Sequence, residues 1–319
     1  MPITSFKTGT KSRSMLVGNA FFDPDSLIRG LFVGGYVSST NNTIDYVTIA
    51  TTGNATDFGD ATSTGGYLAG CASSTRGLTM YGTTGAALSN VIEYVTIATT
   101  GNGTDFGDTT ITRFMAGGCS SSTRGIFGGG DTGGDTASNV IDYVTIATTG
   151  NATDFGDTSV ARHGVSGCSS STRGIFAGGN GASNGNIIDY ITIATTGNAT
   201  DFGDLTGSGR FYGGCSSSTR GLFGGGGNNT ANNVIDYITI ATTGNATDFG
   251  DLTLSRGFVG AASSLIRGVF MGGYASGNPN NTMDYVTIAS TGNATDFGDL
   301  TVARYVGATF SNGHGGLAA

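Results

Sequence analysis

The chain has 319 residues, of which 58 are glycine and 3 are proline, and only 11% of its residues are charged. Its formal net charge of −8 argues against a nucleic-acid-binding protein, because binding to phosphates needs a basic face. No apolar run approaches the roughly 18 residues that a membrane span needs. Residues 1–14 lack the apolar core of a secretory signal peptide. We therefore expect an acidic protein with no signal peptide, no membrane insertion and no nucleic-acid partner.

One segment, NVIDYVTIATTGNATDFGD at residues 139–157, occurs in six nearly identical copies that are spaced 47 to 49 residues apart. A glycine-rich chain with few charges can be disordered. Here, however, the apolar residues recur at fixed places in a long period, which is typical of a folded repeat protein. The tyrosine of the segment, expected to be structural, falls at Tyr46, Tyr94, Tyr143, Tyr190, Tyr237 and Tyr285.

Each repeat predicts four short strands and no helix. In the third copy the expected strands are residues 114–121, 126–130, 140–148 and 152–156. In residues 140–148, Ile141 and Tyr143 alternate with Val144 and Ile146, so both faces of the strand carry apolar side chains. A sheet with one solvated face would show one polar side. The pattern therefore predicts an all-β protein, a β-propeller of four-stranded antiparallel blades.

The unit resembles a kelch repeat. It has an apolar strand that ends in Gly128-Gly129, a variable loop, Tyr143, a second aromatic residue at Phe155, and Arg162 before the next strand. Kelch units usually have tryptophan where this chain has Phe155. Kelch-type oxidases have a copper site with histidine and tyrosine ligands, and this chain lacks the histidines to form it. The resemblance extends over nearly the whole chain and implies a propeller.

The amino-acid sequence of the repeat, IDYVTIATTGNATDFGDLT, is also similar to that of repeat proteins of marine bacteriophages, especially cyanophages. This second resemblance implies a virion protein that is assembled in the host cytoplasm. Its partners would then be other virion proteins, in a symmetric assembly of several copies.

The repeats predict six blades within residues 13–299, with a seventh, partial blade as the alternative. Residues 1–12 hold a degraded copy of a repeat strand, and residues 300–319 hold an extra first strand and a tail. Propeller rings close when one end of the chain completes a blade begun by the other. We expect either residues 300–311 or the N-terminal segment to complete the shared blade. The tail at 311–319 is expected to be flexible or to act as a contact peg.

Two arginines recur in each unit, and pairing with the recurrent aspartates is the expected use; an anion pocket on the axis is the alternative. One series is Arg29, Arg76, Arg124, Arg173, Arg220 and Arg267. The other is Arg13, Arg113, Arg162, Arg210, Arg256 and Arg304, with Gly65 in the remaining unit. Four cysteines at one place in successive units are expected to be buried free thiols: Cys71, Cys119, Cys168 and Cys215.

No catalytic residue, metal site or cofactor is expected. The only histidines are His163 and His314, and neither recurs from repeat to repeat. A Ser-His-Asp triad or a histidine metal site would have to use one of these two residues. The turn at 149–151 is expected to be tight. Asn151 and Asp154 are interpreted as Asx-turn residues, with Gly156 bending the strand. A calcium site in this turn is the alternative that stays open.

The repeats differ mainly in the loop after each second strand, and these loops should share one face of the propeller. The candidate recognition residues on them are Ser38, Asn41, Thr84, Asp131, Asp135, Asn180, Asn184, Asn228, Asn229, Tyr274 and Asn278. The leading hypothesis is a non-enzymatic structural protein of a phage particle, in a tail, nozzle, fibre or capsid, that makes protein–protein contacts. The alternative is an adhesin that binds a host surface glycan or receptor through these loops.

Overall fold

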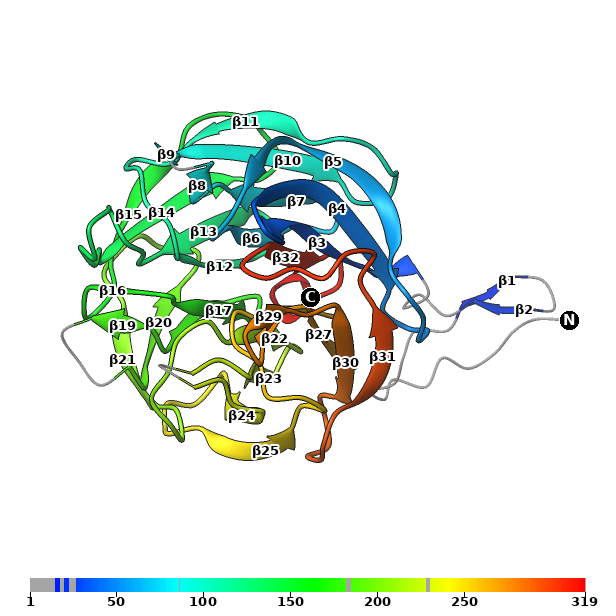
Figure 1. The fold of residues 1–319 in the computed structure, drawn as a ribbon. Coiled ribbons are helices and arrows are strands. Elements are labelled where there is room, and N and C mark those ends of the chain that lie inside the picture. Colours follow the sequence, from blue (N-terminus) through cyan, green and yellow to red (C-terminus); the bar gives the residue numbers. More distant parts are fainter. Residues whose placement is uncertain are drawn as a thin grey trace, which may run out of the picture.

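The computed structural model describes residues 15–17, 20–22, 27–85, 87–181, 185–227 and 230–318. Six four-stranded antiparallel sheets are arranged as blades around a central axis, which confirms the predicted β-propeller and its six blades (Figure 1). The inner strands of neighbouring blades contact one another around the axis. The expectation of a degraded strand at residues 1–12 lies outside the described residues.

Each blade begins with a strand at the axis, and its other strands follow outward. The first blade contains β32 (Ala308–Ser311), β3 (Arg29–Tyr36), β4 (Thr40–Thr48) and β5 (Thr56–Gly65). The second contains β6 (Ala69–Ala72), β7 (Arg76–Met80), β10 (Val91–Thr96) and β11 (Thr104–Asp108). The third contains β12 (Gly117–Ser120), β13 (Arg124–Gly128), β14 (Val140–Thr145) and β15 (Thr153–Asp157).

The other three blades repeat this order. The fourth contains β17 (Ser166–Ser169), β18 (Arg173–Ala177), β20 (Ile187–Thr192) and β21 (Thr200–Asp204). The fifth contains β22 (Gly213–Ser216), β23 (Arg220–Gly224), β24 (Val234–Thr239) and β25 (Thr247–Asp251). The sixth contains β26 (Gly260–Ser263), β27 (Arg267–Met271), β30 (Thr282–Thr287) and β31 (Thr295–Asp299).

Short two-stranded ladders lie outside the blades. They pair β1 (Met15–Val17) with β2 (Ala20–Phe22), β8 (Thr83–Thr84) with β9 (Ala87–Leu88), β16 (Arg162–His163) with β19 (Asn180–Gly181), and β28 (Tyr274–Ala275) with β29 (Asn278–Pro279). A single turn of 3-10 helix, η2 (Gly315–Leu317), follows the last strand.

The C-terminal strand closes the ring. β32 pairs antiparallel with β3, with Phe310 opposite Leu31, so the first blade takes its inner strand from the other end of the chain. Of the two closing segments that the sequence left open, the C-terminal one occupies this place. β1 pairs with β2 in a separate hairpin. Closure by a late strand ties the two ends of the chain together and leaves the first blade no free inner edge.

The tail is not a flexible extension. Residues 312–318 turn back at the ring centre, and Gly315 and Gly316 are buried there. A Cβ added to Gly316 would lie 1.9 Å from the Ser120 carbonyl oxygen, and one added to Gly315 would lie 2.0 Å from that of Ser217. Only glycine allows the tail to approach the inner strands so closely. The tail therefore plugs one end of the axial channel.

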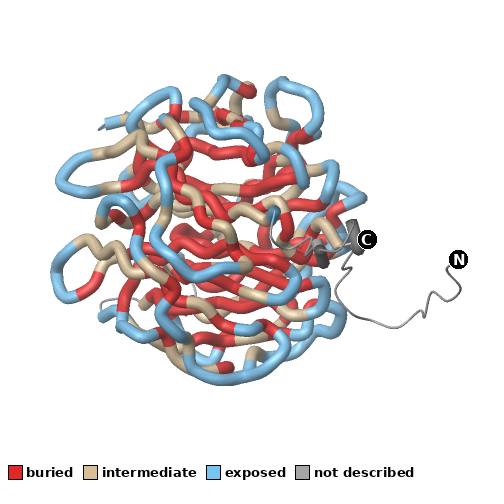
Figure 2. Tube along the Cα trace, turned by 90° about the vertical axis from the view of Figure 1, so that its right-hand side faces the viewer, coloured by how far each residue is buried: buried red, intermediate tan, exposed pale blue. Residues whose placement is uncertain are grey.

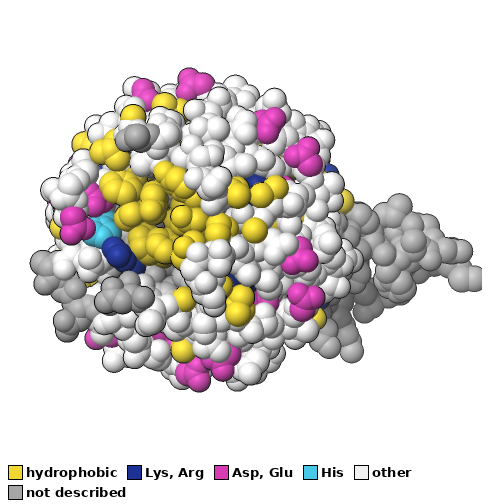
Figure 3. All heavy atoms as spheres, viewed as in Figure 1, with side chains coloured by type: hydrophobic (Ala, Val, Ile, Leu, Met, Phe, Trp, Pro, Cys, Tyr) yellow, Lys and Arg dark blue, Asp and Glu magenta, His cyan; other side chains and the backbone are white. Residues whose placement is uncertain are grey.

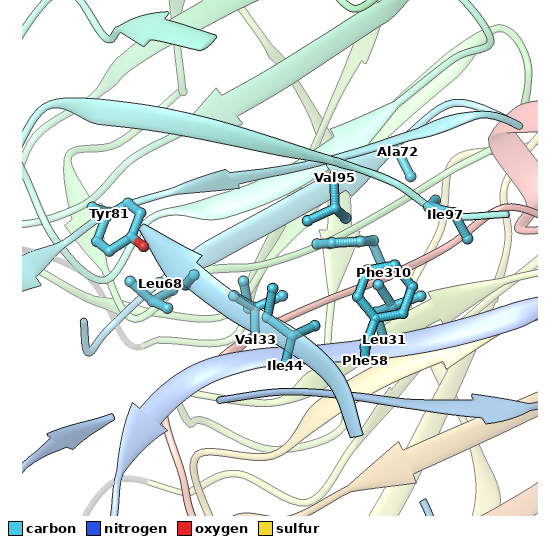
Figure 4. Close-up of a cluster of buried hydrophobic side chains, with 12 residues drawn as sticks. Leu31, Val33, Ile44, Phe58, Leu68, Ala72, Tyr81, Val95, Ile97 and Phe310 are labelled. Atoms are coloured by element: carbon cyan, nitrogen blue, oxygen red, sulfur yellow. The ribbon is translucent and has the colours of Figure 1, made fainter. Parts of the chain in front are cut away.

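The apolar side chains form six clusters, each between two successive blades. In the cluster of Figure 4, Leu31, Val33 and Phe58 of the first blade face Leu68 and other residues of the second. Figure 2 shows buried residues along the strands and exposed residues in the connecting loops. The two-sided apolar pattern thus reflects burial of both faces of each blade.

Replacing Gly174 with alanine is expected to destabilise the ring by about 1–3 kcal/mol, because it overpacks an interface between blades. A Cβ at this position would lie 2.7 Å from the Sγ atom of Cys119 in the preceding blade. The double variant Gly174→Ala/Cys119→Ala should recover part of the loss. Gly207 is the matched control, since a Cβ there meets nothing within 4 Å. Equal midpoints of urea unfolding for Gly174→Ala and Gly207→Ala would contradict the prediction.

Candidate functional site

The loops after the second strands share one face with the segments that lead into the inner strands. Short bridges join the two, between Phe114 and Asp131, between Gly257 and Tyr274, and at equivalent places in other blades. We call this surface the loop face. Its described loop residues are 37–42, 83–85, 87–90, 131–139, 180–181, 185–186, 227, 230–233 and 274–281.

An aromatic patch lies at the centre of the loop face. It consists of Tyr36, Tyr67, Phe114, Phe211, Phe258, Tyr274 and Tyr305, all of them partly exposed. Phe211 and Phe258 stack with their ring centroids 4.2 Å apart, and Tyr274 lies 4.9 Å from Tyr305. Tyr67 and Phe211 lie with Met115 around a hollow on the axis. Figure 3 shows apolar side chains gathered at the centre of this face.

The patch depends on an unusual backbone conformation at one position of each inner-strand approach. The φ angle there is +55° at Tyr67, +63° at Phe211 and +57° at Phe258. The equivalent residues Met115, Gly164 and Val306 also have positive φ. Non-glycine residues adopt this region rarely and at a cost. The surrounding ring therefore holds these side chains over the axial opening instead of letting them turn into the blades.

Beside the patch lies a polar cluster that occurs once in the ring, formed by Asp131, Asp135, His163 and Arg210. His163 Nδ1 lies 3.8 Å from Asp131 Oδ2, and His163 Nε2 lies 3.6 Å from Asp135 Oδ1. Arg210 Nη1 lies 3.0 Å from His163 Nε2. Burial lowers the pKa of His163, Asp131 opposes that effect and Arg210 adds to it. The ring of His163 is therefore neutral at pH 7.

The predicted recognition residues are distributed unevenly on the loop face. Asp131 is buried and accepts hydrogen bonds from the backbone of Gly133 and Thr136, so it shapes its own loop. Asn41 likewise accepts from the Thr43 amide. The exposed members are Ser38, Asp135, Asn180 and Asn278, while Thr84 is partly exposed. Asn184, Asn228 and Asn229 lie outside the described residues.

Sequence reasoning missed most of the aromatic patch, of which it named only Tyr274. The sequence did contain a sign of the patch. In several repeats an aromatic residue stands four or five positions before the cysteine or the residue that replaces it, as Tyr67 does before Cys71 and Phe114 before Cys119. It also treated His163 as an isolated residue. The partners of His163 come from a loop of the third blade and from the approach to the fifth, and only the ring brings them together.

Four arginines of the Arg113 series form buried ion pairs with aspartates. Arg113 Nη2 lies 2.9 Å from Asp142 Oδ2, and Arg162 Nη1 lies 2.8 Å from Asp189 Oδ2. Two further pairs are Arg256 with Asp284 and Arg304 with Asp45. All eight side chains are at most 1% exposed. These four carboxylates therefore neutralise buried arginines of the propeller scaffold.

Arg210 does not belong to this series, which corrects the sequence interpretation. It precedes Cys215 by five residues instead of six, and Gly209 stands at the paired position. A Cβ at Gly209 would lie 2.3 Å from the hydroxyl of Tyr212, so the tyrosine fills the space of the missing arginine. The aspartate of this blade, Asp236, is therefore buried without an arginine, and burial raises its pKa.

The second blade reaches the same result with different residues. Gly65 stands at the arginine position, and Tyr81 fills the space. Glu93 is buried there and accepts hydrogen bonds from the amide and hydroxyl of Thr62. Burial raises the pKa of Glu93, although the bonds from Thr62 oppose the effect. Two blades of the six thus carry a buried carboxyl group that has no cationic partner within the described part of the chain.

The other arginine series stacks on the repeated tyrosines instead of pairing with aspartates. The guanidinium carbon of Arg124 lies 4.7 Å from the ring centroid of Tyr143, and its Nη1 donates to the carbonyl of Ile193 in the next blade. The same stacking joins Arg29 to Tyr46, Arg76 to Tyr94, Arg173 to Tyr190, Arg220 to Tyr237 and Arg267 to Tyr285. Each such pair therefore links two blades.

The segment that joins the third and fourth strands also links blades. The connection spans residues 146–152 and is not a tight turn. Asn151 Oδ1 accepts from the amide of Asp108 in the preceding blade, so its hydrogen bond is not local. The amides of Gly150 and Ala152 donate to the carbonyl groups of Phe106 and Asp108, which lie on one strand of the preceding blade.

Among the described residues, the only group of three potential metal-ligating side chains is Asp131, Asp135 and His163.

The four cysteines are free and buried, as predicted. Each lies on an inner strand, and a Cβ on a glycine of the following blade would come within 2.8 Å of its Sγ atom. Burial raises the pKa of Cys71 and Cys215 to about 12, so these thiols stay protonated at neutral pH. They are packing residues and not nucleophiles.

No known protein family matches the chain, and no curated protein is significantly similar to it. Within the described parts of the chain, no helix has the length and apolar character that crossing a bilayer requires.

Proposed function

We propose that this protein is a non-enzymatic binding module of a phage particle whose loop face makes protein–protein contacts. The observation that carries the proposal is the aromatic patch at the centre of the loop face. Aromatic residues are enriched at protein interfaces, and contiguous exposed apolar surfaces commonly mark them. The phage setting rests on the resemblance of the repeat to phage sequences, and the kelch relationship rests on the kelch-like unit.

The use of the repeated polar residues supports a binding role over an enzymatic one. The arginines, aspartates, tyrosines and cysteines that recur from blade to blade are engaged in contacts within and between blades. What varies between blades is the surface of the loop face. A constant scaffold with a variable face is the arrangement that binding proteins use.

The virion assignment is tested by mass spectrometry of purified particles. The proposal expects the protein in the particle, in several copies. Absence from purified particles would contradict it.

The contact surface is tested with the double variant Phe211→Ser/Phe258→Ser. It should fold but lose incorporation into particles, because it removes the stacked pair of the patch. The matched control is Leu265→Ser/Ile266→Ser, which removes two exposed apolar residues from the turn between the first and second strands of the sixth blade, on the face opposite the loops. Equal incorporation of both variants would exclude the patch as the contact surface.

A second candidate function is a glycan- or receptor-binding adhesin that uses the same face. It is favoured by the stacked pair Phe211–Phe258, an aromatic platform with exposed Asp135 and Asn180 on nearby loops. A glycan array and a host-adsorption assay with loop-exchanged variants test it. Binding of a defined glycan that is lost in Phe211→Ser/Phe258→Ser would support the adhesin. The absence of glycan binding together with unchanged adsorption would exclude it.

A further inference from the structure

The polar cluster beside the aromatic patch contains the donor atoms of a metal site. Asp131 and Asp135 come from the loop after β13, and His163 comes from β16 at the entrance to the next blade. One oxygen of each carboxylate and one nitrogen of the imidazole all lie within 4.8 Å of one another. All three residues stand where the repeats differ, so the cluster is not a consequence of the repeated scaffold.

His163 supplies an independent observation. The residue is 2% exposed, and its Nδ1 atom has no hydrogen-bond partner although it is buried. Nδ1 faces Asp131 Oδ2 at 3.8 Å, which is too long for a hydrogen bond. Buried polar atoms in folded proteins are nearly always paired. An unpaired imidazole nitrogen that faces a carboxylate is therefore a place where a cation can bind.

We propose that Asp131, Asp135 and His163 bind a divalent transition-metal cation, with Zn²⁺ as the best match. Ligand atoms around tetrahedral Zn²⁺ lie about 3.4 Å apart, given metal–ligand bonds of about 2.1 Å. The separation between His163 Nδ1 and Asp131 Oδ2 exceeds this by only a few tenths of an ångström. One imidazole with two carboxylates suits zinc, whereas calcium prefers oxygen ligands alone. The site goes beyond the proposed function and does not depend on it.

Asp131 is held in place for this role. Its Oδ1 atom accepts from the amides of Gly133 and Thr136, which leaves Oδ2 directed at His163. Asp135 is different, because its side chain is 80% exposed and its Oδ1 atom lies 3.6 Å from Nε2, the other nitrogen of the imidazole ring. Asp135 must therefore close over the ion, and solvent water completes the coordination.

Arg210 competes with the metal for this cluster. Arginine only donates, so the contact between Arg210 Nη1 and His163 Nε2 places the imidazole proton on Nδ1 in the metal-free protein. Binding of a cation at Nδ1 requires that proton to move to Nε2, and the guanidinium must then turn away. No proton is released overall from the ring. Arg210→Gln should consequently strengthen metal binding, because it removes both the competing contact and a repelling charge.

The test uses the full chain, purified without a histidine tag and stripped with a chelator. Isothermal titration with ZnCl₂ should give one ion per chain, with weaker binding of CaCl₂. His163→Phe and Asp131→Asn should each weaken zinc binding at least about tenfold. Both substitutions introduce a residue that another blade has at the equivalent position, Phe114 or Asn180, and both variants should therefore keep the fold.

The control is His314→Gln, which removes the other histidine and should leave zinc binding unchanged. Thermal unfolding in the presence of chelator verifies that each variant is folded. If the wild-type chain takes up no zinc in excess metal, or if His163→Phe binds zinc as tightly as the wild type, the proposal is overturned. An unchanged affinity in Arg210→Gln would overturn the competition by the guanidinium.

Discussion

Replacing Asp142 with asparagine is expected to destabilise the protein by about 3–5 kcal/mol, because it leaves the guanidinium of Arg113 buried without its counter-charge. Both side chains of this pair are 0% exposed. Arg113 Nη2 also donates to the carbonyl of Phe127, but Nε and Nη1 have no partner. Among the residues that the structure describes, the aspartate is thus the only group that balances the charge, and loss of its charge exposes the full cost of burying the arginine.

The same substitution two blades further on, Asp236→Asn, is expected to leave stability unchanged or to increase it at neutral pH. Gly209 replaces the arginine there, and burial raises the pKa of Asp236. A carboxyl group whose pKa is higher in the folded state stabilises the fold below its unfolded pKa, and this contribution disappears as the pH rises through the folded pKa. Once the pH exceeds the folded pKa, the carboxyl group is ionised at a cost, and asparagine removes that cost.

Urea unfolding of the wild type and of both variants at pH 7 checks this contrast. Asparagine can still accept from the amide of Thr206, which donates to Asp236 in the wild type. Any gain from Asp236→Asn should diminish as the pH falls toward the range where the carboxyl group is protonated. The double variant Arg113→Met/Asp142→Asn should regain much of the stability lost in Asp142→Asn. Equal losses for Asp142→Asn and Asp236→Asn would show that pairing with arginine does not decide the outcome.

Protonation of His314 is expected to loosen the tail from the axial channel. His314 Nε2 lies 3.0 Å from the Ala72 carbonyl, and Nδ1 accepts from the amide of Gly316 at 3.1 Å. The neutral ring with its proton on Nε2 satisfies both contacts. A second proton on Nδ1 would face the N–H group of Gly316, which can only donate. The charged ring therefore fits this site poorly.

The direction of the pH dependence follows from the pKa. Burial lowers the pKa of His314, and the hydrogen bond to Ala72 opposes this. A histidine whose folded pKa is depressed adds stability that is fully present above its unfolded pKa of about 6.5 and is lost as the pH falls through the folded pKa. Acidification from pH 7.5 should therefore weaken the tail. At pH 7.5, His314→Ala should cost about 1–2 kcal/mol through lost hydrogen bonds.

Hydrogen exchange of the tail amides at several pH values measures this release, after correction for the intrinsic pH dependence of exchange. In the wild type, the amide of Leu317, which donates to the His314 carbonyl, should lose protection on acidification. In His314→Asn this pH dependence should disappear, while His163→Phe should retain it. The same pH dependence in His314→Asn and the wild type would contradict the role of His314.

Several features of the candidate site could be predicted only in part. The variable loops identified the face, and Asp131, Asp135, Asn180 and Tyr274 do lie on it. Asp131, however, is buried and holds its own loop together. Whether a polar loop residue is exposed depends on which backbone amides its side chain can reach in the folded loop. The sequence does not show which amides these are. The kelch and phage relationships stay predictions.

By itself, the sequence determined the all-β class and the four-stranded blade, and it favoured six blades over seven. These depend on local alternation and on a period of about 48 residues, which report burial on both faces of each strand. Only the tertiary structure decided which end closes the ring, because the sequence offered a candidate segment at each end, an extra first strand in residues 300–311 and a degraded repeat strand in residues 1–12. It also decided the place of Arg210, since a shift of one residue reverses the direction of a side chain. The aromatic patch and the His163 cluster depend on ring closure, because their residues come from several blades and meet only around the axis.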